Sequence, residues 1–251
     1  MVFFAPTPRP RTSARPDVGE GGDFHPARNS QQSSSVKMLV SAGPTREFVD
    51  PVRFLSNRST GRMGFAVARA GVEAGHEVAM VCGPVSIEPP SGLFALDNVV
   101  SARDMLAALE ARLEWCDVLV MTAAVADFRP EAPAARKIRK GEMPEFLRLV
   151  PNPDILAALA PRKGDRVFVG FAAETGDAVD SAASKMRRKG LDMIVANDVT
   201  RPGAGFAVDT NEAAILTPDA LPQALPLMPK IELARIIVDR AARLAAARRR
   251  P

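Results

Sequence analysis

The sequence predicts an α/β fold: a Rossmann-like, mostly parallel sheet with helices on both faces and a late antiparallel hairpin at the edge. From Val36 onward, short apolar runs alternate with helical patterns, which is typical of parallel strands joined by crossover helices. The runs are almost wholly apolar, as strands buried on both faces are. A late segment at 206–219 ("FAVDTNEAAILTPD") has the pattern of a hairpin, which commonly forms an antiparallel edge on such a sheet.

Strands and helices are expected in regular alternation. The strands fall at 36–43, 76–83, 117–125, 166–174 and 192–198. The helices fall at about 62–74, 101–115, 152–160, 177–190 and 229–249. Ser101 and Asp104 have the spacing of a capping box at the start of one helix, and Gly190 stands where a C′ glycine would end another.

The chain divides into a tail, a folded domain and a basic end. Residues 1–36 are rich in Pro, Gly, Ser and Arg without periodicity, so we expect a disordered tail. The folded domain spans 37–247, and 248–251 form a basic tail. The formal charge of +4 lies in the two tails, which argues against a nucleic-acid-binding surface on the domain. No apolar run approaches the ~20 residues that span a membrane, so we expect no membrane association.

Cysteine and histidine are too scarce for several common catalytic sites. Cys82 and Cys116 share no motif, and a reducing cytoplasm is the expected location. His25 lies in the tail, and His76 lies in a turn where a lone histidine is usually solvated. A Ser-His-Asp triad, a Cys-His pair or a His-rich zinc site would have only His76 to use. We therefore expect chemistry that runs on Lys, Arg, Asn and Asp.

The turn at 56–64 ("SNRSTGRMG") is the first candidate for ligand binding. Asn57, Ser59, Gly61 and Gly64 place polar groups and accessible backbone N–H donors at a helix start, which favours a bound phosphate. The spacing is neither that of a Walker loop nor that of the Gly-x-Gly-x-x-Gly dinucleotide fingerprint. The alternative is that the two glycines only permit close packing of the helix on the sheet.

Further charged residues follow the expected strands, whose carboxyl ends meet at one rim of the sheet. The segment 136–141 ("RKIRKG") could close over a polyphosphate, or it could be a solvated basic surface. Lys185 and Lys189, four residues apart, share one side of a helix and could form a second cationic wall, although ordinary surface lysines have the same pattern. Asp127 could hold a hydroxyl or a magnesium-bound water, while Asp154 is expected to cap its helix.

Read together, six blocks of the sequence resemble phosphopantothenoylcysteine synthetase (phosphopantothenate–cysteine ligase) of the bacterial, CTP-dependent type. The resemblance covers about Val36 to Leu244, with the motifs in the family's order. The blocks are "SAGPTREFVDPVRFLSNRSTGRMG", "TAAVADFRP", "KIRK", "NPDIL", "GFAAET" and "ANDV".

The resemblance implies a ligase of coenzyme A biosynthesis. In the family, 4′-phosphopantothenate attacks the α-phosphate of CTP, which releases pyrophosphate and leaves an acyl-cytidylate. The amino group of L-cysteine then attacks the acyl carbon and releases CMP. Mg²⁺ accompanies the triphosphate, and no covalent enzyme intermediate is needed. Catalysis would rest on orientation and charge stabilisation.

The resemblance also implies roles for individual residues. Asn57 would hold the substrate carbonyl, Arg53 would reach the phosphopantothenate of a neighbouring subunit in a homodimer with shared sites, and Lys137 would belong to a mobile covering loop. Ala123, Ala124 and Asp127 would line the substrate and the nucleotide. Ser59, Gly61 and Gly64 would contact phosphate. The remaining nucleotide contacts would be Met121, Thr122, Pro153, Asp154, Ile155, Leu156, Phe171, Lys185 and Lys189.

Two departures from the family pattern are visible. Arg139 stands at the third position of a Lys-x-Lys-Lys motif, which keeps the charge and alters its geometry, while Lys140 keeps the fourth position. Bifunctional relatives carry a flavin-dependent decarboxylase domain first, which residues 1–36 are too short to contain. We therefore expect a synthetase alone, without flavin, that depends on a separate decarboxylase enzyme.

Two other classes of protein stay open. An NAD(P)-dependent oxidoreductase of similar fold would want a glycine-rich turn directly after the first strand and an acid after the second, but the second strand ends in "VCGP" and the chain has no tyrosine. A non-catalytic nucleotide-binding module could have kept the pocket and lost the reaction. The presence of Asn57 and Lys137 weighs against it.

Overall fold

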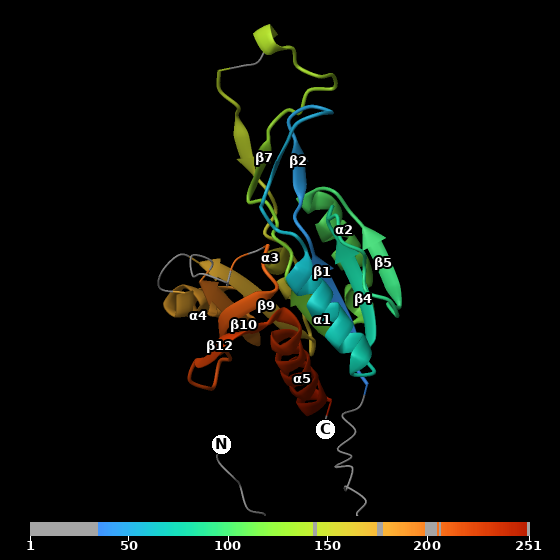
Figure 1. The fold of residues 1–251 in the computed structure, drawn as a ribbon, viewed down its shortest axis with the longest axis vertical. Helices are drawn as coiled ribbons and strands as arrows, with labels where there is room; N and C mark the ends of the chain where they lie inside the picture. The colour runs from blue at the N-terminus through green and yellow to red at the C-terminus, as the bar shows by residue number, and fades with distance from the viewer. Residues whose placement is uncertain (1–34, 143–144, 175–177, 199–204, 206, 250–251) are drawn as a thin grey trace, which may run out of the picture. The chain divides into compact units, whose positions relative to one another are not determined.

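Eight strands form the main sheet of the computed structural model, in the order β12-β11-β10-β9-β6-β1-β4-β5 (Figure 1). The structure describes residues 35–249 except 143–144, 175–177, 199–204 and 206, all within one compact unit that spans residues 33–251. The parallel strands are β1 (Lys37–Ala42), β4 (Glu77–Cys82), β5 (Ala95–Asn98), β6 (Val118–Met121), β9 (Val167–Glu174) and β10 (Met193–Asp198). At one edge, β11 (Thr210–Leu216) and β12 (Gln223–Pro229) run antiparallel. The predicted fold class is confirmed.

Helices cover both faces of this sheet, and each face has its own hydrophobic core. The first core joins the sheet to α1 (Arg62–Glu73) and α5 (Lys230–Arg248). The second joins it to α2 (Ala102–Arg112), α3 (Ile155–Leu159) and α4 (Ala178–Arg188). Successive residues of a strand face opposite sides, so Leu39 enters one core and Val40 the other. This two-sided burial is why the strands are apolar throughout.

The structure differs from the prediction mainly in short strands. The hairpin predicted at 206–219 contains only β11, and its second strand is β12, whose Pro226 and Pro229 are tolerated because the strand lies at the sheet edge. β5 was not predicted. The long polar connection after β1 contains β2 (Arg46–Phe48) and β3 (Phe54–Ser56), which pair with each other. A second unpredicted ribbon pairs β7 (Phe128–Pro130) with β8 (Leu149–Pro151).

The two ribbons form a projection that we call the arm (β2, β3, β7 and β8). β2 contacts β7, and Figure 1 shows both rising away from the main sheet. Single 3₁₀ turns complete the fold at Leu113–Trp115, Lys140–Glu142 and Ala160–Arg162.

The predicted helix caps are present. Ser101 and Asp104 form the full capping box of α2, and Asp154 caps α3 by accepting a hydrogen bond from the backbone N–H of Ala157 (3.2 Å). Of the residues described, no helix has the length and apolar character needed to cross a membrane.

Both ends of the described chain contact the folded body. The expected disordered tail lies outside the described residues as far as residue 34, while Val36 is buried. The last helix ends at Arg248, the first residue of the expected basic tail. Arg248 pairs with Asp192, and Arg249 pairs with Asp117.

Gly64 packs α1 against the strand ends, so its replacement by Ala should destabilise the fold. A Cβ atom there would meet Thr122 Oγ1 and would lie 2.6 Å from the Ala42 side chain. We expect Gly64→Ala to lower the free energy of unfolding by about 1–3 kcal/mol in urea denaturation. Gly141→Ala, whose Cβ would meet no atom within 4 Å, is the matched control and should change it by less than about 0.5 kcal/mol. Equal stability of the two variants would refute this packing role.

Candidate active site

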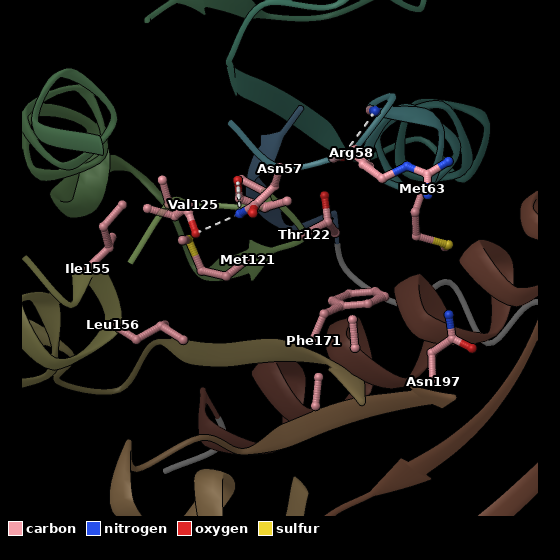
Figure 2. Close-up of a pocket in the computed structure, with 18 of the residues that line it drawn as sticks. Asn57, Arg58, Met63, Met121, Thr122, Val125, Ile155, Leu156, Phe171 and Asn197 are labelled. Atoms are coloured by element: carbon pink, nitrogen blue, oxygen red, sulfur yellow. Dashed lines mark hydrogen bonds between the residues drawn. The ribbon is translucent and has the colours of Figure 1, made fainter. Parts of the chain in front are cut away.

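A cavity of about 630 Å³ opens beyond the carboxyl ends of β6, β9 and β10. Ligands of open parallel sheets bind at such positions. All of the site residues predicted from the sequence line this cavity, with the exception of Arg53 and Lys137. Figure 2 shows Ile155 and Leu156 at one side and Met63 and Asn197 at the other, with Phe171 and Thr122 between them.

Asn57 reaches the rim of the cavity from the turn that follows β3. Its side-chain Nδ2 donates to the backbone oxygens of Ala124 (3.2 Å) and Val125 (3.1 Å), as the dashed lines in Figure 2 show. These two bonds fix the amide against the segment that leaves β6. Asn57 therefore joins two segments that are far apart in the sequence, at the rim of the cavity.

The turn after Asn57 leads into α1 with an accessible backbone. Gly61 is the N-cap of α1 with φ 78°, a left-handed conformation that favours glycine. Its N–H donates to Ser59 Oγ (3.3 Å), and no side chain caps the helix. The first turn of α1 thus presents backbone donors to the cavity, which suits an anion.

Hydrogen bonds to the end of β1 hold the segment after β6. Thr122 Oγ1 donates to the Ser41 carbonyl, and the Ala123 N–H donates to Ser41 Oγ (3.2 Å). The Ala124 N–H donates to the Gly43 carbonyl (2.9 Å). The cavity wall is consequently pinned to the central strand, so its backbone groups are preorganised.

A cationic wall lies on the α4 side of the cavity. Lys185 Nζ donates to the Phe171 carbonyl (2.7 Å), and Lys189 pairs with Asp154 (3.0 Å). Burial opposes ionisation of Asp154, but Lys189 and the Ala157 N–H outweigh burial and lower its pKa. Asp154 therefore does more than cap α3, because it also positions one of the two predicted lysines.

Arg53 lies in the loop between β2 and β3, and the basic segment (136–141) lies in the connection between β7 and β8; both are outside the cavity, and a buried acid links them. Asp50 accepts hydrogen bonds from Arg53 Nε (3.0 Å) and from the Ile138 N–H (3.1 Å). Arg53 in turn donates to the Ile138 carbonyl (2.8 Å). The guanidinium of Arg53 holds the pKa of the Asp50 carboxyl well below its ordinary value. Asp50 and Arg53 thereby hold the backbone of Ile138. The residues on either side of it, Lys137 and Arg139, are exposed cations.

Replacing Asp50 should impair any reaction that depends on Lys137 or Arg53. In Asp50→Asn an amide NH₂ group would replace one of the two carboxylate oxygens, although Arg53 and the Ile138 N–H both need an acceptor there. The basic segment would then shift, and turnover should fall about tenfold. Asp97→Asn is the matched control, because it also removes an aspartate paired with an arginine, Arg112, but on β5 and α2. Steady-state kinetics on both variants checks this. Equal effects of the two substitutions would mean that Asp50 has no special role.

Neither thiol is available as a nucleophile. Cys82 and Cys116 are buried, and burial raises their pKa values to about 11 and about 12. His76 was expected to be solvated but is buried, within 3.5 Å of the Val36 N–H, and burial lowers its pKa. None of the three lines the cavity.

The cavity also contains residues that were not predicted from the sequence, among them two cations and a buried amide. Arg62 begins α1, Asn211 lies on β11, and Lys230 begins α5. Arg62 lies within the turn at 56–64 but was assigned no role, and Asn211 and Lys230 belong to no recognisable motif. Only the position of Lys230 directly after a strand, at a helix start, could have suggested it.

Comparisons with known proteins show the family of the chain. Residues 33–244 match the family described as "DNA/pantothenate metabolism flavoprotein C-terminal domain". "Coenzyme A biosynthesis bifunctional protein CoaBC" of Bacillus subtilis (strain 168) is 43% identical over 208 residues, which cover 83% of this chain and 51% of that protein. The chain thus spans about half the length of the curated relatives it matches.

Two solved structures have a similar fold. The C-terminal domain of a Coenzyme A biosynthesis bifunctional protein CoaBC is 37% identical, with a TM-score of 0.71 over 83% of this chain and 95% of that one. A Cab2 mutant in complex with phosphopantothenate-cysteine is 16% identical, with a TM-score of 0.68 over 84% of this chain and 88% of that one. The second likeness extends to the fold alone.

Proposed function

The chain belongs to the DNA/pantothenate metabolism flavoprotein C-terminal domain family, and from this premise we propose that it is a ligase that joins 4′-phosphopantothenate to L-cysteine in coenzyme A biosynthesis. The observation that carries the proposal is that one cavity gathers Asn57, the first turn of α1, Lys185 and Lys189. The names of the relatives support the pathway. CTP as the activating nucleotide rests on the sequence resemblance.

In the first step a carboxylate oxygen of 4′-phosphopantothenate forms a bond to the α-phosphorus of CTP. The bond from that phosphorus to the bridging oxygen breaks, and pyrophosphate leaves with the electron pair. Ser59, Gly61 and Gly64 would contact the phosphates, while Lys185, Lys189 and Phe171 would hold the rest of the nucleotide. Negative charge builds up on the departing pyrophosphate. The positive charge of Lys137 and the backbone N–H donors at the start of α1 would stabilise it.

In the second step the amine of L-cysteine attacks the acyl carbon. The new C–N bond forms, the C–O bond to the cytidylate breaks, CMP leaves with the electron pair, and the amine releases its proton. Asn57 and the backbone at Ala123 and Ala124 would orient the acyl group. No protein nucleophile is required, which agrees with the high pKa values of both thiols.

Mg²⁺ would be held mainly by the substrate phosphates. Among residues 35–249, apart from the segments left undescribed, no three acidic, cysteine or histidine side chains form a metal cluster. Asp127 lines the cavity and offers one carboxylate, and Mg²⁺ takes one or two such groups beside substrate phosphates. The ion would neutralise charge on the polyphosphate.

A homodimer with shared sites is part of the proposal. Exposed apolar side chains gather on the arm, and an exposed group of this kind marks an interaction surface. They are Phe48, Phe54, Phe128 and Leu149. Arg53 and Lys137 lie on or beside the same arm and outside the cavity of their own chain, so a second copy is where they would act.

Placing a charge in this surface should separate the dimer. Phe128, 52% exposed, becomes buried if the arm is the interface, so we expect Phe128→Glu to weaken association by on the order of 3 kcal/mol. Leu221→Glu, at a 91% exposed position outside the arm, should leave the dimer intact. Sedimentation equilibrium measures both. A dimer of unchanged stability in the Phe128 variant would exclude the arm as the interface.

The proposed reaction is tested by following its product. Purified chain with 4′-phosphopantothenate, L-cysteine, CTP and Mg²⁺ should yield 4′-phosphopantothenoylcysteine, detected by mass spectrometry. Omitting any one substrate should abolish the product. Oxidation of NADPH without formation of that product would instead favour an oxidoreductase.

A further inference from the structure

One end of the cavity contains polar residues to which the family resemblance assigns no role. It lies on the side of Met63 and Asn197, opposite Ile155 and Leu156 (Figure 2). The starts of α1, β11 and α5 meet there and contribute Arg62, Asn211 and Lys230.

Asn211 is the most informative of these residues. Only 4% of it is exposed, yet it lines the cavity, and its side-chain Oδ1 has no hydrogen-bond partner within the described part of the chain. A buried amide atom without a partner costs free energy that a ligand can recover. Because the two ends of an amide exchange by a half-turn, Asn211 can offer the ligand either an acceptor or a donor.

Arg62 makes this end of the cavity a donor site for an anion. One of its terminal nitrogens pairs with Asp209, but its Nε is buried and lacks a hydrogen-bond partner among the residues described. The residue directly before it, Gly61, opens the first turn of α1 with uncapped N–H groups. A guanidinium N–H beside a helix N-terminus suits phosphate.

Lys230 adds positive charge and fixes the wall. Its Nζ donates to the carbonyls of Val208 (2.6 Å), Thr210 (2.8 Å) and Gly205 (3.2 Å), so it holds the start of β11 in place. Burial lowers the pKa of Lys230, the nearby Asp209 opposes that shift, and repulsion from Arg62 adds to it, so Asp209 and Arg62 both lie near Lys230. Lys230 therefore acts on a bound anion through its charge and through the wall that it positions.

We infer that Arg62 and Asn211, in a wall positioned by Lys230, bind the terminal phosphates of the nucleotide, the part that leaves as pyrophosphate. The inference rests on the proposed function for the identity of the ligand. Both proposed substrates carry phosphate, so the 4′-phosphate of phosphopantothenate is the other ligand that this end of the cavity could bind. The nucleotide is favoured because Arg62 directly follows Gly61, in the turn that would contact its phosphates.

Binding measurements on Arg62→Gln and Asn211→Leu test the inference. Titration calorimetry would compare CTP, CMP, inorganic pyrophosphate and 4′-phosphopantothenate on each variant. Losing one charge-assisted or buried hydrogen bond should weaken CTP and pyrophosphate about tenfold, with CMP unchanged within about twofold. Arg69→Gln, an exposed arginine of the same helix, is the control and should change none of them.

The outcomes are separable. Retained CMP binding shows that a variant is folded. Equal weakening of CMP and CTP, or weakening of 4′-phosphopantothenate alone, would overturn the inference, as would unchanged CTP and pyrophosphate binding. Pyrophosphate tests the subsite whatever the nucleotide is. If the wild-type chain binds pyrophosphate through Arg62 but forms no ligated product, the proposed function fails and the subsite stands.

Discussion

Asn57→Asp should reduce turnover at least ~100-fold, the scale of a lost transition-state contact, while the chain still folds. The side-chain Nδ2 of Asn57 donates to two backbone carbonyls, Ala124 and Val125. A carboxylate has no donor for them, and it would bring negative charge toward two anionic substrates. The acyl group would then lose its orientation, and the first step would slow as well.

Two measurements separate this effect from a folding defect. Thermal denaturation should show similar stability, because Asn57 is exposed and no core contact is lost. Single-turnover release of pyrophosphate should show the full decrease in rate. A rate within a few-fold of the wild type would remove Asn57 from the reacting centre.

Lys137→Gln should have an effect of comparable size, again at least ~100-fold. The lysine is exposed beside the clamped Ile138, so its replacement should cost no stability. What disappears is a positive charge that would meet the departing pyrophosphate. Steady-state turnover at saturating substrates measures this.

Arg136→Gln is the matched control for the lysine. Arg136 is the neighbouring cation, and 77% of its side chain is exposed. Nearly normal turnover in that variant, beside a large loss in Lys137→Gln, would assign the effect to one position. Equal losses would reduce the segment to a general basic surface, and normal rates in both would contradict any catalytic role.

The central sheet and most of the cavity could be predicted from the sequence because their signals are local. A strand such as β1 is apolar at successive positions, since its two faces enter different cores. The carboxyl ends of parallel strands meet at one rim, so Met121 and Phe171 could be placed near each other without any long-range information. Ser101 and Asp154 were recognisable as caps from their immediate neighbours.

The arm and one end of the cavity could not be predicted, for a physical reason. β2, β3, β7 and β8 have three residues each, too short for a clear alternating pattern, and β7 and β8 also depend on pairing across a long sequence separation, such as Phe128 with Pro151. Nothing in the local sequence distinguishes Asp50 from other acids of a polar connection, because its burial beside Arg53 is a result of the fold. Asn211 and Lys230 belong to no motif, and only the meeting of β11 with α5 brings them to the cavity.

The most direct test of the central claim is pyrophosphate release in the absence of cysteine. We expect release from CTP only when 4′-phosphopantothenate is present, at most one equivalent per site, and CMP only after L-cysteine is added. ATP in place of CTP should react more slowly. If neither nucleotide yields pyrophosphate with that substrate, the assignment of the chain as this ligase is wrong.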